Sequence, residues 1–208
     1  MSKLKHFFEQ SWLLVVSSFF FGLLIAVTNA ALSPIIEQQK INKLNALAGA
    51  MLPAAENFVP LEEPIEMSTA RGKTRPVPVY RAQDANDKCV GWTFNATGSG
   101  FSGPIELVVC VDAAFEKIAG FDVLVSTETV GYGDRMKEDE FRDQFKGAPA
   151  GKLTLSTTGE RKDKEPDAEI IAISGATISS EAAVDAINDA VTQIKAALQK
   201  KGLIEDGK

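Results

Sequence analysis

A short run of small and hydroxyl residues near the C-terminus has the composition of a phosphate-binding turn. Ser174, Gly175, Ala176 and Thr177 follow an apolar run and precede a segment whose apolar residues recur at helical spacing over 183–198. This order predicts a strand, a turn and an amphipathic helix. Because backbone N–H groups and the positive end of the helix dipole converge at a helix N-terminus, a phosphate is favoured beside Thr177. Gly175 and Ala176 would let it approach closely.

Ordinary helix capping is the alternative interpretation of this turn. Serine and threonine are common N-cap residues, and Glu181 is typical of a first helical turn. We interpret Ser179 and Ser180 as helix caps rather than as sites of attachment. The pattern by itself leaves capping and anion binding both open.

A second candidate stretch is the glycine-rich loop that begins at Glu128 and Thr129 and continues through Gly131 and Gly133. It precedes a polar, helix-like segment that contains phenylalanines. Gly-x-Gly marks tight turns more often than ligand sites, so this loop alone is weak evidence for binding.

Composition excludes several classes of function. The 208 residues carry a net charge of −6, which disfavours nucleic acid as a partner. Cys89, Cys110 and the single histidine, His6, lack the spacing of a zinc or iron–sulfur site. We find no nucleophile–base pair, so independent catalysis is not expected. Whether the two cysteines form a disulfide is left open.

An uncharged apolar run at 12–32 predicts a transmembrane helix, because at 1.5 Å per residue it spans a bilayer core of ~30 Å. Lys3 and Lys5 place residues 1–11 in the cytoplasm and the main domain beyond the membrane. A cleaved signal peptide is the alternative, with a tolerable site at 28–30. The length of the run favours retention.

Beyond the membrane span we expect a connecting amphipathic helix at 33–53, a loop at 54–76, a folded domain at 77–199 and a polar tail at 200–208. The apolar stripe of the connecting helix is interpreted as core packing in preference to a partner site.

Strand-like runs at 77–81, 89–97, 105–112 and 117–125 predict an α+β fold with a largely antiparallel sheet and flanking helices. The glycine-rich turn at 98–103 predicts a hairpin between the second and third runs. Phenylalanine side chains in and near these runs are interpreted as core rather than as flavin-stacking residues. They are Phe94, Phe101, Phe115 and Phe121.

The string Ser-Gly-Ala-Thr followed by Ser resembles the flavinylation motif of FMN-binding domains, whose threonine carries FMN through a phosphoester bond. The resemblance implies covalent FMN on Thr177, with Ser174, Gly175 and Ala176 around its phosphate. Glu-Thr-x-Gly-x-Gly resembles the second signature of the same domains. It implies that Glu128, Thr129, Gly131 and Gly133 lie near the isoalloxazine ring. For Glu128, a hydrogen bond that stabilises the loop is the alternative.

Most of the chain resembles the G subunits of Rnf electron-transport complexes, which are related to the C subunits of sodium-translocating NADH:quinone oxidoreductases. The resemblance implies a flavoprotein electron carrier, anchored in the bacterial inner membrane with its domain in the periplasm. It would serve a ferredoxin:NAD oxidoreductase coupled to ion translocation. The implied partners are the other membrane subunits and a flavin transferase. This chain departs from the motifs at Ile171, where Asp is usual, and at Val130, where Pro is common.

A second class of function is a non-redox periplasmic scaffold or anion-binding module. Covalently bound flavin would discriminate between the two, because a scaffold would be colourless.

Overall fold

The computed structural model describes residues 2–68, 72, 74–157 and 166–204. The chain divides into two compact units, Met1–Asn42 and Lys43–Lys208. The first unit is helical. The second contains a sheet domain together with the end of the N-terminal helix.

Helix α1 (Ser2–Met51) runs without interruption through both predicted helices, and Pro34 lies inside it rather than between two helices. Its segment Ser11–Met51 contains a window of mean hydropathy 2.1 and is long and apolar enough to cross a membrane. The side chains from Trp12 to Val27 are exposed. These properties are those of a membrane anchor.

The domain is built on a five-stranded antiparallel sheet with the order β1-β4-β5-β6-β7. Its strands are β1 (Asn57–Pro60), β4 (Val79–Gln83), β5 (Cys89–Ser99), β6 (Pro104–Asp112) and β7 (Ile118–Ser126). The predicted antiparallel α+β fold and the β5–β6 hairpin are confirmed.

The prediction of a loop at 54–76 was wrong. Besides β1, this stretch contributes β2 (Ile65–Ser68) and β3 (Thr74–Val77), which pair antiparallel. Ile65 and Met67 are buried while the residues between and after them are exposed. That alternation covers only four residues, too short to show a period amid Pro and charged residues. Pro76 is tolerated because β3 pairs on one side only.

The remaining elements are η1 (Gly133–Lys137), α2 (Asp139–Arg142), the parallel pair β8 (Thr154–Ser156) and β9 (Glu169–Ile171), and α3 (Thr177–Lys200).

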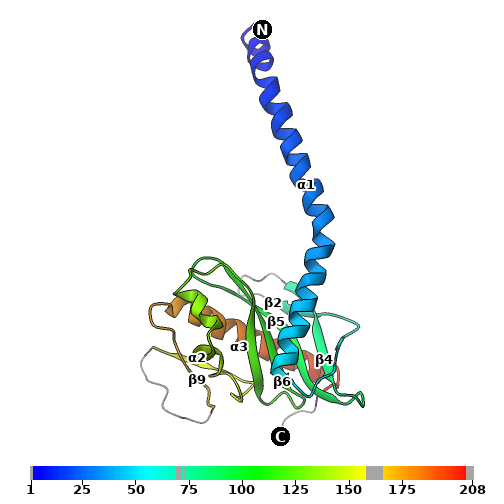
Figure 1. The fold of residues 1–208 in the computed structure, drawn as a ribbon, viewed down its shortest axis with the longest axis vertical. Coiled ribbons are helices and arrows are strands. Elements are labelled where there is room, and N and C mark those ends of the chain that lie inside the picture. The colour runs from blue at the N-terminus through cyan, green and yellow to red at the C-terminus, as the bar shows by residue number, and fades with distance from the viewer. Residues whose placement is uncertain (1, 69–71, 73, 158–165, 205–208) are drawn as a thin grey trace. The chain divides into compact units, whose positions relative to one another are not determined.

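Helix α3 packs along β5 and closes the main core (Figure 1). Its inner side chains are fully buried, as the periodic pattern predicted, among them Ala183, Ile187 and Ile194. Phe94, Phe115 and Phe121 also lie in this core, as predicted. Phe101 does not: it is 72% exposed, because it lies in the turn beyond the paired ends of β5 and β6.

The end of α1 covers the opposite face of the sheet. Leu44 packs with Val108 and Leu124, and Ala48 packs with Cys110. Since neighbouring residues of β6 alternate between the two faces, the sheet is buried on both sides. The predicted core role of the connecting helix is confirmed for this part.

Both cysteines are free thiols. Cys110 lies opposite Thr93 in the β5–β6 pairing and contacts its hydroxyl at 3.2 Å, whereas Cys89 lies opposite Gln83 on the other side of β5. The register therefore keeps the two thiols apart.

Candidate functional site

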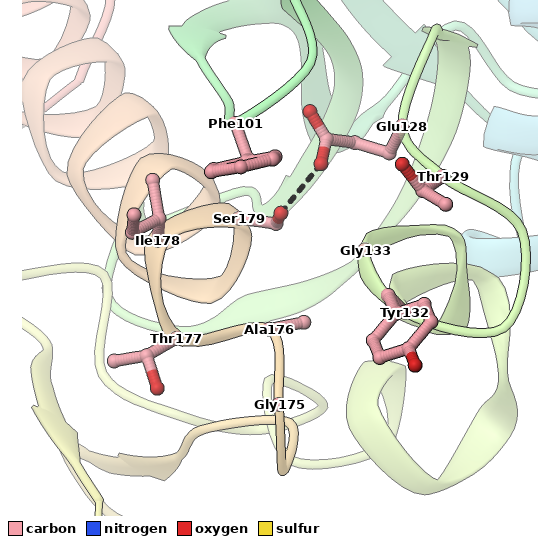
Figure 2. Close-up of a pocket in the computed structure, with 10 residues that line it drawn as sticks. All are labelled: Phe101, Glu128, Thr129, Tyr132, Gly133, Gly175, Ala176, Thr177, Ile178 and Ser179. Atoms are coloured by element: carbon pink, nitrogen blue, oxygen red, sulfur yellow. Dashed lines mark hydrogen bonds between the residues drawn. The ribbon is translucent and has the colours of Figure 1, made fainter.

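A pocket of about 540 Å³ lies where the first turn of α3, the loop after β7 and the β5–β6 turn meet (Figure 2). A volume of this size lies within the range of small-molecule and cofactor sites. Its lining residues are Phe101, Glu128, Thr129, Tyr132, Gly133, Gly175, Ala176, Thr177, Ile178 and Ser179.

One wall of the pocket is the N-terminus of α3. Gly175 adopts a positive φ of 78°, which turns the chain into the helix, and Ala176 is the N-cap without a side-chain cap. The first backbone bond back to this cap is donated by Ser180 N–H, at 3.0 Å. Within the described part of the chain, the N–H groups of 177–179 have no recorded acceptor. Free N–H groups at a helix N-terminus favour an anion such as phosphate.

The prediction that Ser179 and Ser180 cap the helix was wrong. Both follow the N-cap, and their hydroxyl groups bind elsewhere. Ser180 Oγ accepts a bond from Ile173 N–H and donates one to Ala176 C=O, each at 3.0 Å. Ser180 thus holds the preceding loop against the helix and leaves the first N–H groups available.

Glu128 is buried, with 8% of its surface exposed. Its Oε2 accepts a hydrogen bond from the Ser179 hydroxyl at 2.6 Å, drawn as the dashed line in Figure 2. Its Oε1 accepts a hydrogen bond from Ser102 N–H at 2.9 Å. The carboxylate therefore joins three separate segments. These are hydrogen bonds that stabilise the loop, the role given above as the alternative to a flavin contact for Glu128.

Two glycines make room for this carboxylate. A Cβ on Gly133 would lie 2.4 Å from Glu128 Oε2, and a Cβ on Gly100 would lie 2.3 Å from Oε1. Such distances are far below contact, so any larger residue would displace Glu128.

The structure brings most of the predicted site residues into this pocket: Glu128, Thr129, Gly133, Gly175, Ala176 and Thr177. Ser174 and Gly131 do not line it. Gly131 has a φ of 81° and serves the turn before η1. Thr177 is exposed, and its hydroxyl is directed away from Glu128 (Figure 2).

Sequence reasoning missed the apolar lining, which comes from Phe101, Tyr132 and Ile178. All three are large and exposed, and the Tyr132 ring comes within 3.6 Å of the Cβ position of Gly175. A signal was available for the two aromatic residues, because each stands between glycines or next to one in a turn, where a core position is improbable.

Together these residues fit FMN. The N–H groups of 177–179 could donate to the phosphate of such a ligand, and the aromatic and aliphatic side chains provide surface for a flat ring system. Among the residues that the structure describes, no cluster of His, Cys, Asp or Glu could hold a metal ion. The N–H groups at the start of α3 suit an organic phosphate.

Comparison with known proteins identifies a family and several similar chains. The family model of the FMN-binding domain matches residues 100–192. The G subunit of the ion-translocating oxidoreductase complex of Methanosarcina acetivorans is 30% identical over 94% of this chain and 98% of its own length. The G subunit of the proton-translocating ferredoxin:NAD(+) oxidoreductase complex of Clostridium ljungdahlii is 30% identical, covering 87% and 88% of the two chains.

Solved structures resemble the domain as well. Shewanella oneidensis NqrC superimposes with a TM-score of 0.53 at 25% identity, over 69% of this chain and 73% of NqrC. The C subunit of the Na(+)-translocating NADH-quinone reductase of Parabacteroides distasonis gives 0.52 at 17% identity over 82% and 96%, a likeness of fold alone. The extent of the match to the G subunits, together with the FMN-binding domain, shows that this chain belongs to the G-subunit family of Rnf-type ion-translocating oxidoreductase complexes.

Proposed function

We propose that this chain is a membrane-anchored electron carrier whose FMN is attached to Thr177 through a phosphoester. The observation that carries the proposal is the position of Thr177. It is the first residue of α3, exposed at a pocket, beside N–H groups with no recorded acceptor in the described chain. A phosphate on its oxygen would lie in the field of those groups.

The chain's own residues bind and orient the cofactor. The α3 N-terminus would hold the phosphate, the Gly175 turn would admit it, and the apolar lining would pack against the ring. When bound, the flavin supplies one- or two-electron transfer. Covalent attachment prevents loss of the cofactor when its charge changes.

A separate transferase installs the flavin. Glu128 is held by Ser179 and Ser102, and no base contacts the Thr177 hydroxyl among the described residues, so self-catalysis is not expected. An activated donor, such as a flavin dinucleotide, is required. The Thr177 oxygen bonds to the FMN-side phosphorus, the phosphoanhydride bond breaks, AMP leaves and the hydroxyl proton passes to the transferase.

The anchor gives this carrier its location. The long apolar part of α1 crosses the bacterial inner membrane, with Lys3 and Lys5 on the cytoplasmic side and the sheet domain in the periplasm. In that position it would pass electrons among the other subunits of a ferredoxin:NAD oxidoreductase that translocates ions.

The test is the intact mass of the full-length chain purified from its native membrane, beside Thr177→Ala. We expect the mass of one attached FMN on the unaltered chain and none on the variant. An unmodified chain from a host that possesses the transferase would contradict the proposal and favour a non-redox scaffold. Flavin retained by Thr177→Ala would show that the attachment site is wrong.

A further inference from the structure

The aromatic ring of Phe101 is exposed although it belongs to a hydrogen-bonded turn. It lies at the tip of the β5–β6 hairpin, 72% exposed, and lines the pocket beside Ile178 (Figure 2). Isolated exposed apolar residues are common on protein surfaces. Phe101 differs from these because it lines a pocket with other exposed apolar side chains.

Hydrogen bonds hold the turn that carries Phe101. Gly100 N–H donates to Gly103 C=O at 2.8 Å, and Ser102 N–H donates to Glu128 Oε1 at 2.9 Å. The hydroxyl groups of Ser102 and Thr129 are 3.2 Å apart. These contacts offset the conformational entropy that is lost when the turn becomes ordered. The Phe101 ring therefore already lines the pocket before any ligand binds.

Glu128 links this turn to the attachment site. The carboxylate that binds the residue after Phe101 also binds Ser179, two positions after Thr177. A displacement of Glu128 would therefore move the ring of Phe101 relative to the first turn of α3. The close packing of Gly100 and Gly133 on its two oxygens leaves it little freedom.

We propose that Phe101 stacks on the isoalloxazine ring of the FMN carried by Thr177, and that Glu128 is the positioning residue that holds Phe101 there. This inference rests on the proposed function. Offset stacking on a flat ring would bury the apolar face that the structure leaves exposed. In this proposal Glu128 holds Phe101 in position and does not itself contact the flavin.

The experiment uses indole as a probe, because tryptophan in contact with a flavin quenches its fluorescence by electron transfer. Full-length chain is purified with its flavin in a Tyr132→Phe background, which removes the other aromatic quencher of the pocket. Phe101→Trp is compared with Val59→Trp, an exposed position on the edge strand β1. We expect a severalfold shorter flavin fluorescence lifetime for Phe101→Trp and an unchanged lifetime for Val59→Trp.

The positioning role is tested in the same Phe101→Trp background. Glu128→Ala removes both acceptors, and Gly133→Ala displaces the carboxylate without deleting it. We expect both to restore a long lifetime. Glu128→Gln keeps an oxygen acceptor for Ser102 N–H and should retain the quenching.

Each outcome has a distinct meaning once the intact mass is known. A flavinylated Phe101→Trp chain with the lifetime of the Val59→Trp control would overturn the stacking. Full quenching in both Glu128→Ala and Gly133→Ala would overturn the role of Glu128. A chain without the mass of FMN would overturn the covalent attachment, and this inference with it.

Discussion

Gly98 in β5 and Ala182 in α3 meet where a side chain could not fit: a Cβ built on Gly98 would lie 2.4 Å from the Ala182 carbonyl oxygen. The helix can therefore rest directly on the strand. This close approach lies one turn beyond the α3 N-terminus and at the end of the strand that leads to Phe101. It sets the distance between the two sides of the pocket.

Gly98→Ala should push α3 away from β5. Overpacking of this kind costs about 1–3 kcal/mol of unfolding free energy. The affected contact lies near the site, so we also expect a lower fraction of flavinylated chain. The measurements are denaturant unfolding and intact mass, with Gly151→Ala as the control because nothing lies within 4 Å of its Cβ position. Equal stability of the two variants would show that α3 is not seated on Gly98.

Gln144 pairs with both backbone groups of Ile171, accepting its N–H at 2.8 Å and donating to its C=O at 3.2 Å. Gln144→Leu leaves both groups unpaired, which should cost about 1–3 kcal/mol. The loss should be local, in β9 and the chain leading to Thr177. Hydrogen exchange of residues 169–173 would measure it.

Gln193→Leu is the matched control for Gln144→Leu. Gln193 makes the same pair of bonds with Ser68, at 2.7 and 3.0 Å, but in an exposed place where water can replace it. We expect a smaller loss of stability and unchanged exchange at 169–173. Faster exchange there in Gln193→Leu would mean that the effect is global.

Ser180→Ala should destabilise the approach to α3. The Ser180 side chain is fully buried and is the acceptor for Ile173 N–H, so its removal leaves a buried donor unpaired at a cost of about 1–3 kcal/mol. Urea unfolding would measure the change, with Ser174→Ala as an exposed control. A loss no larger than that of the control would contradict the role given to Ser180.

The sequence was sufficient to predict the anchor from the length of its uncharged apolar run, four strands from their β-forming residues and the hairpin from its glycine-rich turn. It also predicted α3 from the helical spacing of its apolar residues. The short strands β2 and β3 were not predicted, because their alternation covers few residues and Pro76 lies within β3. The β-propensity of four residues is too weak to predict a strand.

The polar members of the site were predictable from their motifs, but their partners were not. Glu128 and Ser179 are 51 positions apart, and only the folded chain brings them within 2.6 Å. Phe101 was assigned to the core because an aromatic residue beside a strand is commonly buried. The glycines of its turn were a signal of exposure, but the register that leaves Phe101 beyond the paired ends of β5 and β6 follows only from the folded sheet.

Cys110 gives the chain a stability that depends on pH. Burial raises the pKa of its thiol to about 12, against a smaller opposite effect of the hydrogen bond with Thr93. The folded-state pKa is thus above that of the unfolded chain, about 8.5. As pH rises, the unfolded state loses its proton first, so the stabilisation is complete below about 8.5 and is lost between that pH and about 12.

Between pH 8.5 and pH 10 we expect the unfolding free energy to fall by about 1.5 kcal/mol through Cys110 alone. Urea unfolding of the full chain in detergent, compared with Cys110→Ala, isolates this contribution, because lysine titration affects both chains equally. The variant should be less stable at neutral pH but should show a flatter decline. Cys89→Ser is the control and should keep the slope of the unaltered chain. Parallel pH profiles for the unaltered chain and Cys110→Ala would contradict the assignment, since the thiol would then titrate alike in the folded and unfolded states.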